Sequence, residues 1–276
     1  NIAMPVLFVI LVIFVGVSLS LPGSMQGVDY FLHPDFSKVT PKVAVSALGQ
    51  AFFSLSLGMG ILITYAGYFP KDTRLMRTAV TVSLLDLLVA VMMGLIIFPA
   101  VTSFGLGGES LRGATLVFVT LPEVFAHMPA TQLWAILFFL LLTVAALTST
   151  ISIAEVSVAF ICDRFGVRRW KSVLIVLMPL FLFSTVCSLS MGPWSDVMIC
   201  GMSIFDFLDN TATNIMLPTA SIGLCIYMGW IAPRKLFMSQ LTNDGALRSR
   251  AYPAVVSIVR YVAPLLIIMI LISSFI

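Results

Sequence analysis

The sequence predicts an all-α integral membrane protein with seven transmembrane helices, one of them broken at mid-membrane. Hydrophobic residues make up 60% of the 276 residues and charged residues 10%, and the mean hydropathy is +1.10. Soluble domains contain roughly 45–50% apolar and about 25% charged residues, so the composition excludes that class. The apolar residues form segments of membrane-spanning length, and one segment carries glycines, serines and a glutamine near its middle.

Seven apolar segments emerge with a window of about 20 residues, the helix length that crosses a bilayer. They are Met4–Leu21, Val43–Phe69, Ala79–Ala100, Gln132–Cys162, Ser172–Leu189, Phe207–Ile231 and Tyr252–Phe275. Several are longer than one perpendicular crossing needs, which indicates tilt or interruption. We therefore expect a single transmembrane domain over residues 1–276.

Lysine and arginine residues gather in alternate connecting loops. Three loops hold eleven of them, namely Lys71, Arg74, Arg77, Arg164, Arg168, Arg169, Lys171, Arg234, Lys235, Arg248 and Arg250. The opposite loops hold only Lys38, Lys42 and Arg112. By the positive-inside rule the first set is cytoplasmic, which predicts a multi-pass protein of the cell (inner or plasma) membrane with residue 1 inside and the C-terminus outside.

Other partners and chemistries are poorly supported by the composition. The net charge of +3 is small and scattered, so a nucleic-acid partner is not expected. The four cysteines have no zinc-ligand spacing and form no CxxC pair, and burial as small apolar residues is their usual role. The chain opens with Asn1 and has no signal-peptide pattern, so we expect an N-terminal portion to precede it.

The segment Ala47–Gly60 is the most informative feature. In hydrocarbon every backbone N–H and C=O must be paired, so weak helix formers at mid-membrane are tolerated where they line a cavity inside the protein. Transporters use such broken helices to present backbone groups to a solute and its coupling ion. The sequence thus predicts a binding site for a small solute inside the membrane.

Carboxylates within apolar segments give a second set of candidates, because ionisable groups there are costly unless they are paired or face a cavity. Asp86 has apolar neighbours on both sides, which favours a cation ligand or proton carrier over a structural ion pair. For Glu155 we favour a hydrogen bond between helices. Asp206 and Asp209 lie near the outer boundary of their segment. An intramembrane aspartyl protease that uses Asp86 and Asp206 is not supported, because the sequence around them does not resemble a GxGD motif.

A cluster of small and hydroxyl residues, Ala145–Ser152, lies well inside the fourth segment. Hydroxyls together with backbone carbonyls freed at a kink form a hard oxygen site that suits a monovalent cation. The alternative is that these hydroxyls bond back to the preceding helical turn or join helices, and on the sequence alone the two readings have similar weight.

Four stretches together resemble the neurotransmitter:sodium symporters, and the bacterial amino-acid branch, typified by the bacterial leucine transporter, looks closest. They are Gln50–Gly60, Asp86 with Gly94, Ala145–Ser149 and Arg260–Pro264. The opening Ala3–Phe8 is similar to the fifth helix of that family. The resemblance implies that the seven segments are spans five to eleven of an inverted-repeat, LeuT-like sodium symporter fold, and that spans one to four are missing.

The same resemblance assigns roles to individual residues. It implies a first sodium site with Ser54 and Asp86, and a second with Ala145, Thr148 and Ser149. It implies a substrate site under the aromatic lid Phe53, whose other members are Ser54, Ser56, Leu57, Met59, Ser149 and Ile153. It also implies an outer gate at Asp206 and an inner gate at Tyr68 and Asp163, with basic partners in the missing portion.

The function implied is sodium-coupled symport by alternating access, without enzyme chemistry or a cofactor. The expected partners are an amino acid, sodium, the lipid bilayer and the N-terminal portion of the transporter. The apolar pocket residues favour hydrophobic or aromatic L-amino acids. Chloride is not expected, because the Asp86 carboxylate would supply the negative charge near sodium. The alternative is a membrane-embedded binding or scaffold fragment that does not transport.

Overall fold

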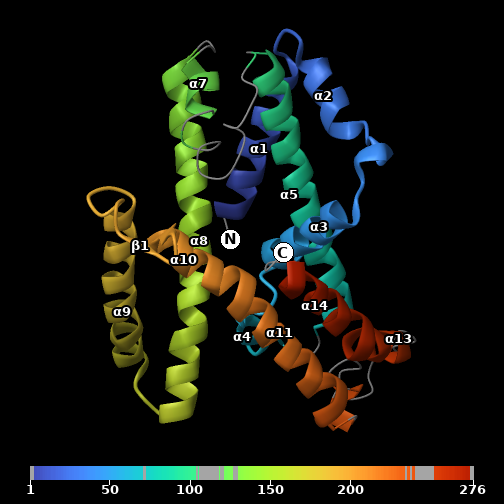
Figure 1. Cartoon of the computed structure of the whole chain (residues 1–276), viewed down its shortest axis with the longest axis vertical. Helices are drawn as coiled ribbons and strands as arrows, with labels where there is room; N and C mark the ends of the chain where they lie inside the picture. Colours follow the sequence, from blue (N-terminus) through green and yellow to red (C-terminus); the bar gives the residue numbers. More distant parts are fainter. Residues whose placement is uncertain are drawn as a thin grey trace. The chain divides into compact units, whose positions relative to one another are not determined.

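The described part of the chain folds mainly as helices (Figure 1). The computed structural model describes residues 3–70, 73–103, 105, 118, 121–126, 130–233, 235–236, 238–239 and 252–273. The first half contains α1 (Ala3–Leu19), α2 (Ser24–Leu32), the 3-10 turn η1 (Phe36–Lys38), α3 (Pro41–Ser54), α4 (Ile61–Ala66), α5 (Leu75–Ser103) and α7 (Leu121–Ala126).

The second half begins with the longest helix of the described chain, α8 (Thr131–Phe165), followed by α9 (Arg169–Ser190). A small antiparallel hairpin then pairs β1 (Met198–Ile199) with β2 (Met202–Ser203). The remaining elements are α10 (Ile204–Asn210), α11 (Leu217–Ile226), α13 (Tyr252–Ser257) and α14 (Ala263–Ser273), with π-helical turns η4 (Thr211–Met216), η5 (Tyr227–Ile231) and η6 (Ile258–Val262) between or after them.

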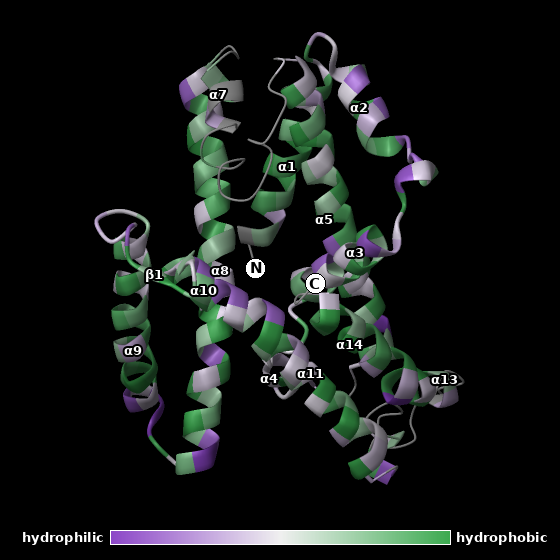
Figure 2. Cartoon of the chain, in the orientation of Figure 1, coloured by the Kyte–Doolittle hydropathy of each residue, from purple (hydrophilic) through white to green (hydrophobic). Residues whose placement is uncertain are grey.

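Five of the seven predicted spans are continuous helical runs long and apolar enough to cross a membrane, and the fold class predicted from the sequence is confirmed. These runs are Leu75–Ser103, Thr131–Phe165, Arg169–Ser190, Ile204–Ile231 and Pro253–Ser273. The first predicted span forms the 17-residue α1, and Met4–Leu19 meets α2 at a bend of 114°. The second predicted span is interrupted between α3 and α4. Helix α9 is apolar along most of its length (Figure 2), and most of its apolar side chains are exposed, as expected for a lipid-facing helix.

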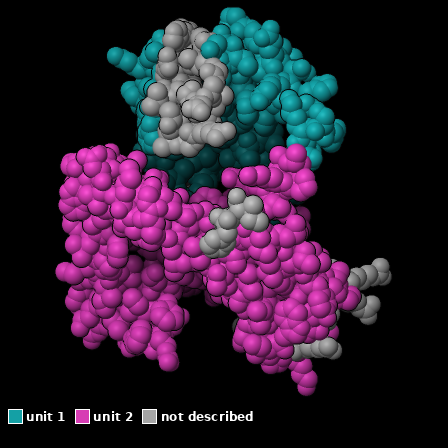
Figure 3. All heavy atoms as spheres, viewed as in Figure 1, with its two compact units in different colours: residues 1–39, 81–150 teal, residues 40–80, 151–276 magenta. Residues whose placement is uncertain are grey.

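The chain divides into two compact units, coloured separately in Figure 3. Unit 1 comprises residues 1–39 and 81–150, and unit 2 comprises residues 40–80 and 151–276. Helices α5 and α8 each contribute to both units, because the boundaries fall within them.

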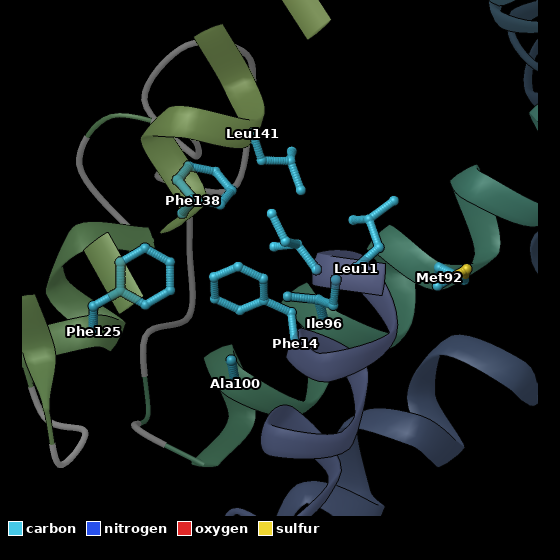
Figure 4. Packing of buried hydrophobic residues seen from close by; sticks show 9 residues of the cluster. Leu11, Phe14, Met92, Ile96, Ala100, Phe125, Phe138 and Leu141 are labelled. Atoms are coloured by element: carbon cyan, nitrogen blue, oxygen red, sulfur yellow. The ribbon is translucent and has the colours of Figure 1, made fainter. Parts of the chain in front are cut away.

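The core of unit 1 is built by four helices. Phe14 of α1, Phe125 of α7 and Phe138 of α8 form a triangle of rings, with the Phe14 centroid 5.8 and 6.1 Å from the other two and those two 5.4 Å apart (Figure 4). Met92 and Ile96 of α5 complete the buried cluster from the other side. A polar contact ties the same helices together, since the buried Ser18 hydroxyl donates to the Ile96 carbonyl at 2.6 Å.

Helix α2 packs against α5 through two glycines, although the sequence places it in a connecting loop. A Cβ on Gly27 would lie 2.5 Å from the Phe98 carbonyl oxygen, and one on Gly94 would lie 2.2 Å from the Phe31 ring. The Phe31 and Phe98 rings are stacked with centroids 5.1 Å apart. Gly27 and Gly94 therefore allow a close helix–helix approach that a larger residue would block.

Candidate functional site

The interruption at residues 55–60 is present where the sequence predicts it. Helix α3 ends in a Schellman-type motif, in which the Leu57 N–H donates to the Phe52 carbonyl at 3.2 Å and the Ser56 N–H to the Phe53 carbonyl at 2.9 Å. Ser56 takes the left-handed conformation that glycine usually fills, with φ of 54°. Helix α3 therefore ends in the middle of the apolar segment, and the next helix, α4, begins only after Gly60 (Figure 1).

Gly58 fixes the interrupted segment against α11. Its φ is 82°, and a Cβ at this position would lie 2.3 Å from the Ser221 hydroxyl oxygen and 2.7 Å from the Leu217 carbonyl oxygen. The Ser221 hydroxyl is buried and has no hydrogen-bond partner among the described residues. Only glycine satisfies both the backbone conformation and the close contact here.

A cavity of about 460 Å³ runs along α3 and extends as far as Phe53, near the C-terminal end of that helix. Helix α3 contributes Gln50 and Phe53, with Phe53 45% exposed while its neighbour Phe52 is buried. The remaining lining residues are Lys42, Val45, Ser46, Gly49 and Phe52 of α3, Asp209, Thr213 and Asn214 of α10 and η4, and Ile270 and Ser273 of α14. The aromatic lid predicted from the sequence thus borders a mixed polar and apolar cavity.

The two carboxylates of α10 have different surroundings. Asp206 lies in the first turn of α10, beside the N-cap residue Ser203. The Asp206 N–H donates to the Ser203 hydroxyl at 3.1 Å, and that hydroxyl donates to the Asp206 carboxylate at 2.7 Å. Asp209 lines the cavity together with Phe53. The assignment of Asp206 to the outer gate stays a prediction, and the structure adds Asp209 as a candidate that the sequence analysis left without a role.

Three of the predicted pocket-wall residues lie in the break itself. Ser56 and Met59 are half-buried, whereas Leu57 is 37% exposed. On α8 the predicted wall residue Ile153 is 50% exposed, one turn beyond Ser149. Their exposure leaves these side chains available for contact with a ligand.

The predicted sodium ligands are divided between the two units. Ser54 belongs to unit 2, while Asp86 of α5 and the residues Ala145, Thr148 and Ser149 of α8 belong to unit 1. The Thr148 hydroxyl donates to the Ala145 carbonyl at 2.9 Å, as the helix-packing reading predicts. The two sodium sites stay predictions.

Tyr68, Glu155 and Arg169 form a hydrogen-bonded cluster at the far end of α4. The Tyr68 hydroxyl donates to Glu155 at 2.8 Å, and the Arg169 guanidinium pairs with the same carboxylate at 2.7 Å. The interpretation of Glu155 as a group that bonds between helices is therefore confirmed. Arg169 thus places one basic group of this chain near Tyr68, and the inner-gate assignment of Tyr68 and Asp163 stays a prediction. Asp163 is exposed and stands outside this cluster.

Helix α4 is further held to α8 by two contacts. The Tyr65 hydroxyl and the Ser152 hydroxyl lie 2.8 Å apart, and a Cβ on Gly60 would lie 3.0 Å from Val156. The sequence gives no direct signal for the pairing of Glu155 with Arg169, because these residues lie 14 positions apart on either side of a helix–helix turn.

A family model for the sodium:neurotransmitter symporter family matches residues 2–276. The chain belongs to this family. It is 38% identical to an uncharacterized sodium-dependent transporter of Haemophilus influenzae, over 98% of this chain and 58% of that protein. It is 34% identical to the uncharacterized sodium-dependent transporter YhdH of Bacillus subtilis, over 98% of this chain and 59% of that protein.

A solved structure has the same fold. The crystal structure of MhsT in complex with L-phenylalanine matches with a TM-score of 0.86 and 36% identity, over 100% of this chain and 62% of MhsT. The chain thus spans about three fifths of the length of these relatives. The chain is a multi-pass membrane protein of a symporter family, which confirms the predicted family and the prediction that the protein is not an enzyme.

Proposed function

We propose that this chain forms part of a sodium-coupled amino-acid symporter and supplies its share of the central binding site. The observation that carries the proposal is the interruption of an apolar segment at residues 55–60, beside the cavity lined by Phe53. Backbone N–H and C=O groups at such a break are available to the carboxylate and ammonium groups of an amino acid.

The substrate class follows from the side chains around the break. Phe53, Leu57, Met59 and Ile153 offer an apolar and adaptable surface, which favours hydrophobic or aromatic L-amino acids. The match to MhsT, whose structure contains L-phenylalanine, supports the same class. Ser54, Ser56 and Ser149 are proposed to bind the polar end of the substrate.

Sodium is proposed to bind at two sites. Ser54 and Asp86 would supply oxygens to the first, and Ala145, Thr148 and Ser149 to the second, since hydroxyl, carbonyl and carboxylate oxygens suit a hard cation. Two bacterial relatives are described as sodium-dependent transporters, which supports sodium as the coupling ion. Because substrate and sodium stabilise the same conformation, each raises the affinity for the other.

Gating is proposed on both sides of the substrate site. Phe53 with Asp206 or Asp209 would close it from one side, and Tyr68 with Asp163 from the other. The Tyr68–Glu155–Arg169 cluster supports a closing contact near Tyr68, since it already joins α4 to α8 and α9 through one carboxylate. The distribution of lysine and arginine supports a topology with residue 1 cytoplasmic and the C-terminus outside.

Uptake into proteoliposomes tests the proposal. The full-length protein should accumulate radiolabelled phenylalanine or leucine when sodium is higher outside, and accumulation should disappear when potassium replaces sodium. The variant Met59→Phe should shrink the pocket and shift competition toward smaller aliphatic amino acids. The exposed residue Met178 of α9 offers a matched control, since Met178→Phe lies far along the chain from the break and should leave the profile unchanged.

Binding assays separate the alternative of a non-transporting binding or scaffold protein. Sodium-dependent binding of phenylalanine without accumulation would support that alternative. Accumulation that persists in potassium would refute sodium coupling. If no common amino acid binds in the presence of sodium, the proposed substrate class is wrong.

A further inference from the structure

Two π-helical turns, η5 and η6, pack against each other at Gly229 and Arg260. Gly229 is buried, and a Cβ there would lie 3.2 Å from the Arg260 Cα, so the backbones approach closely. The Arg260 Nε–H donates to the Gly229 carbonyl at 2.7 Å. That carbonyl belongs to the last turn of its helical run, where no intrahelical donor follows, and the arginine caps it.

The Trp230 ring lies beside the same guanidinium and contacts a second aromatic ring, that of Tyr261. The Arg260 guanidinium carbon lies 5.7 Å from the centroid of the Trp230 ring, and the Trp230 and Tyr261 rings are edge-to-face with centroids 6.0 Å apart. Trp230 is 49% exposed and Tyr261 is 62% exposed. Tryptophan, tyrosine and arginine near the ends of membrane-spanning helices are typical of the boundary between hydrocarbon and lipid headgroups.

The guanidinium keeps hydrogen-bonding capacity beyond the Gly229 carbonyl. Its two terminal NH2 groups have no acceptor among the described residues, and no described carboxylate is paired with it. The surrounding sequence, residues 232–262, contains five cationic residues and one carboxylate, Asp244. A half-buried arginine in this setting calls for an anion, and a phosphate matches its planar donor fork.

We propose that Arg260, Trp230 and Tyr261 form a binding site for the headgroup of an anionic phospholipid. The terminal NH2 groups of Arg260 bind the phosphate, and the exposed faces of the two rings contact the glycerol and upper acyl region. The excess of cations in residues 232–262 favours an anionic headgroup over a zwitterionic one. The site lies outside the cavity beside Phe53 and does not depend on the transport proposal.

Trp230 reports directly on the lipid beside it. The full-length protein is placed in phosphatidylcholine nanodiscs in which a fixed fraction of lipid is replaced by brominated phosphatidylglycerol or brominated phosphatidylcholine. The signal of Trp230 is the fluorescence that the variant Trp230→Phe removes. Brominated phosphatidylglycerol should be enriched at Trp230 about fivefold, the factor expected for one arginine beside an anionic lipid.

Substitutions show whether the enrichment belongs to this site. Arg260→Gln should abolish the enrichment of phosphatidylglycerol at Trp230. Lys235→Gln, which removes an exposed cation five residues after Trp230, should retain most of that enrichment. For each variant, quenching by brominated phosphatidylglycerol is compared with quenching by brominated phosphatidylcholine. A general loss of stability affects both measurements equally and therefore does not change their ratio. If Arg260→Gln does not fold, Arg260→Lys should show a smaller enrichment than the wild type, because lysine lacks the bidentate fork; equal enrichment overturns the proposal.

Other outcomes also overturn it. Equal quenching of Trp230 by both brominated lipids in the wild type excludes the site. If enrichment of phosphatidylglycerol appears only in Asp244→Asn, the Asp244 carboxylate pairs with the Arg260 guanidinium in the wild type and takes the place of the lipid phosphate. Equal losses in Arg260→Gln and Lys235→Gln indicate diffuse attraction. Loss of enrichment on adding inorganic phosphate, relative to sodium chloride of equal ionic strength, identifies a site for free phosphate.

Discussion

The contact between Gly58 and Ser221 gives the sharpest test of how the interrupted segment is held. The change Gly58→Ala introduces two costs. An L-residue at φ of 82° loses about 1–2 kcal/mol of backbone energy, and a Cβ placed 2.3 Å from the Ser221 hydroxyl and 2.7 Å from the Leu217 carbonyl adds about 1–3 kcal/mol of overpacking. The expected destabilisation is therefore about 2–5 kcal/mol.

Gly60 provides a matched control two residues away. Its φ of 79° imposes the same backbone cost, but its Cβ would meet only the Val156 side chain at 3.0 Å. At about 2–4 °C per kcal/mol, Gly58→Ala should lower the unfolding temperature by roughly 10 °C and Gly60→Ala by roughly 5 °C. Thermal unfolding of the protein in nanodiscs, followed by tryptophan fluorescence, measures the difference.

A double-mutant cycle isolates the contact itself. Ser221→Ala removes a buried hydroxyl that has no partner among the described residues, so alone it should leave the unfolding temperature unchanged or raise it. Combined with Gly58→Ala it should recover part of the loss, because one of the two short contacts disappears. Equal effects of Gly58→Ala and Gly60→Ala, or the absence of recovery in the double variant, would refute the reasoning.

Three further predictions concern the ions and the outer gate. Asp86→Asn should raise the sodium concentration needed for half-maximal uptake, because a carboxylate at about 4 Å from sodium contributes roughly 4 kcal/mol at an effective dielectric of 20. For the same reason wild-type uptake should persist when gluconate replaces chloride, and loss of uptake in gluconate would contradict this. Thr148→Ala should raise the sodium requirement about tenfold, because a lost buried ligand costs about 1–3 kcal/mol, and an unchanged sodium titration would leave Thr148 a packing residue. Asp209→Asn should slow uptake more than Asp206→Asn if the cavity-lining carboxylate forms the gate, and the reverse order would assign the gate to Asp206.

The position of the helix break was predictable because it depends on local residue types. Gly58 and Gly60 allow positive φ, and serines at mid-segment are poor helix formers, so the interruption at 55–60 follows from the segment itself. The composition likewise predicts the membrane fold, since helices are the way a single chain of this hydropathy satisfies its backbone in lipid.

Contacts between distant residues were less predictable. The pairing of Glu155 with both Tyr68 and Arg169 depends on how α4, α8 and α9 meet, and no local pattern encodes that geometry. Asp206 and Asp209 look equivalent in sequence, yet the N-cap residue Ser203 bonds to Asp206 while Asp209 lies on the cavity wall. The fold of α2 against α5 was missed because the polar residues of α2 mask the glycine contact that holds it.

The π-helical turn η4 has a consequence for how this chain can vary. A π-helical turn contains about one residue more than an α-helical turn, so η4 amounts to a single-residue insertion absorbed between α10 and α11. Removal of one residue between Thr211 and Met216 would restore a regular α-helix while α10 and α11 keep the faces they present to their neighbours. Length differences of one residue among homologous sequences are therefore expected to fall at this turn, where they cost least.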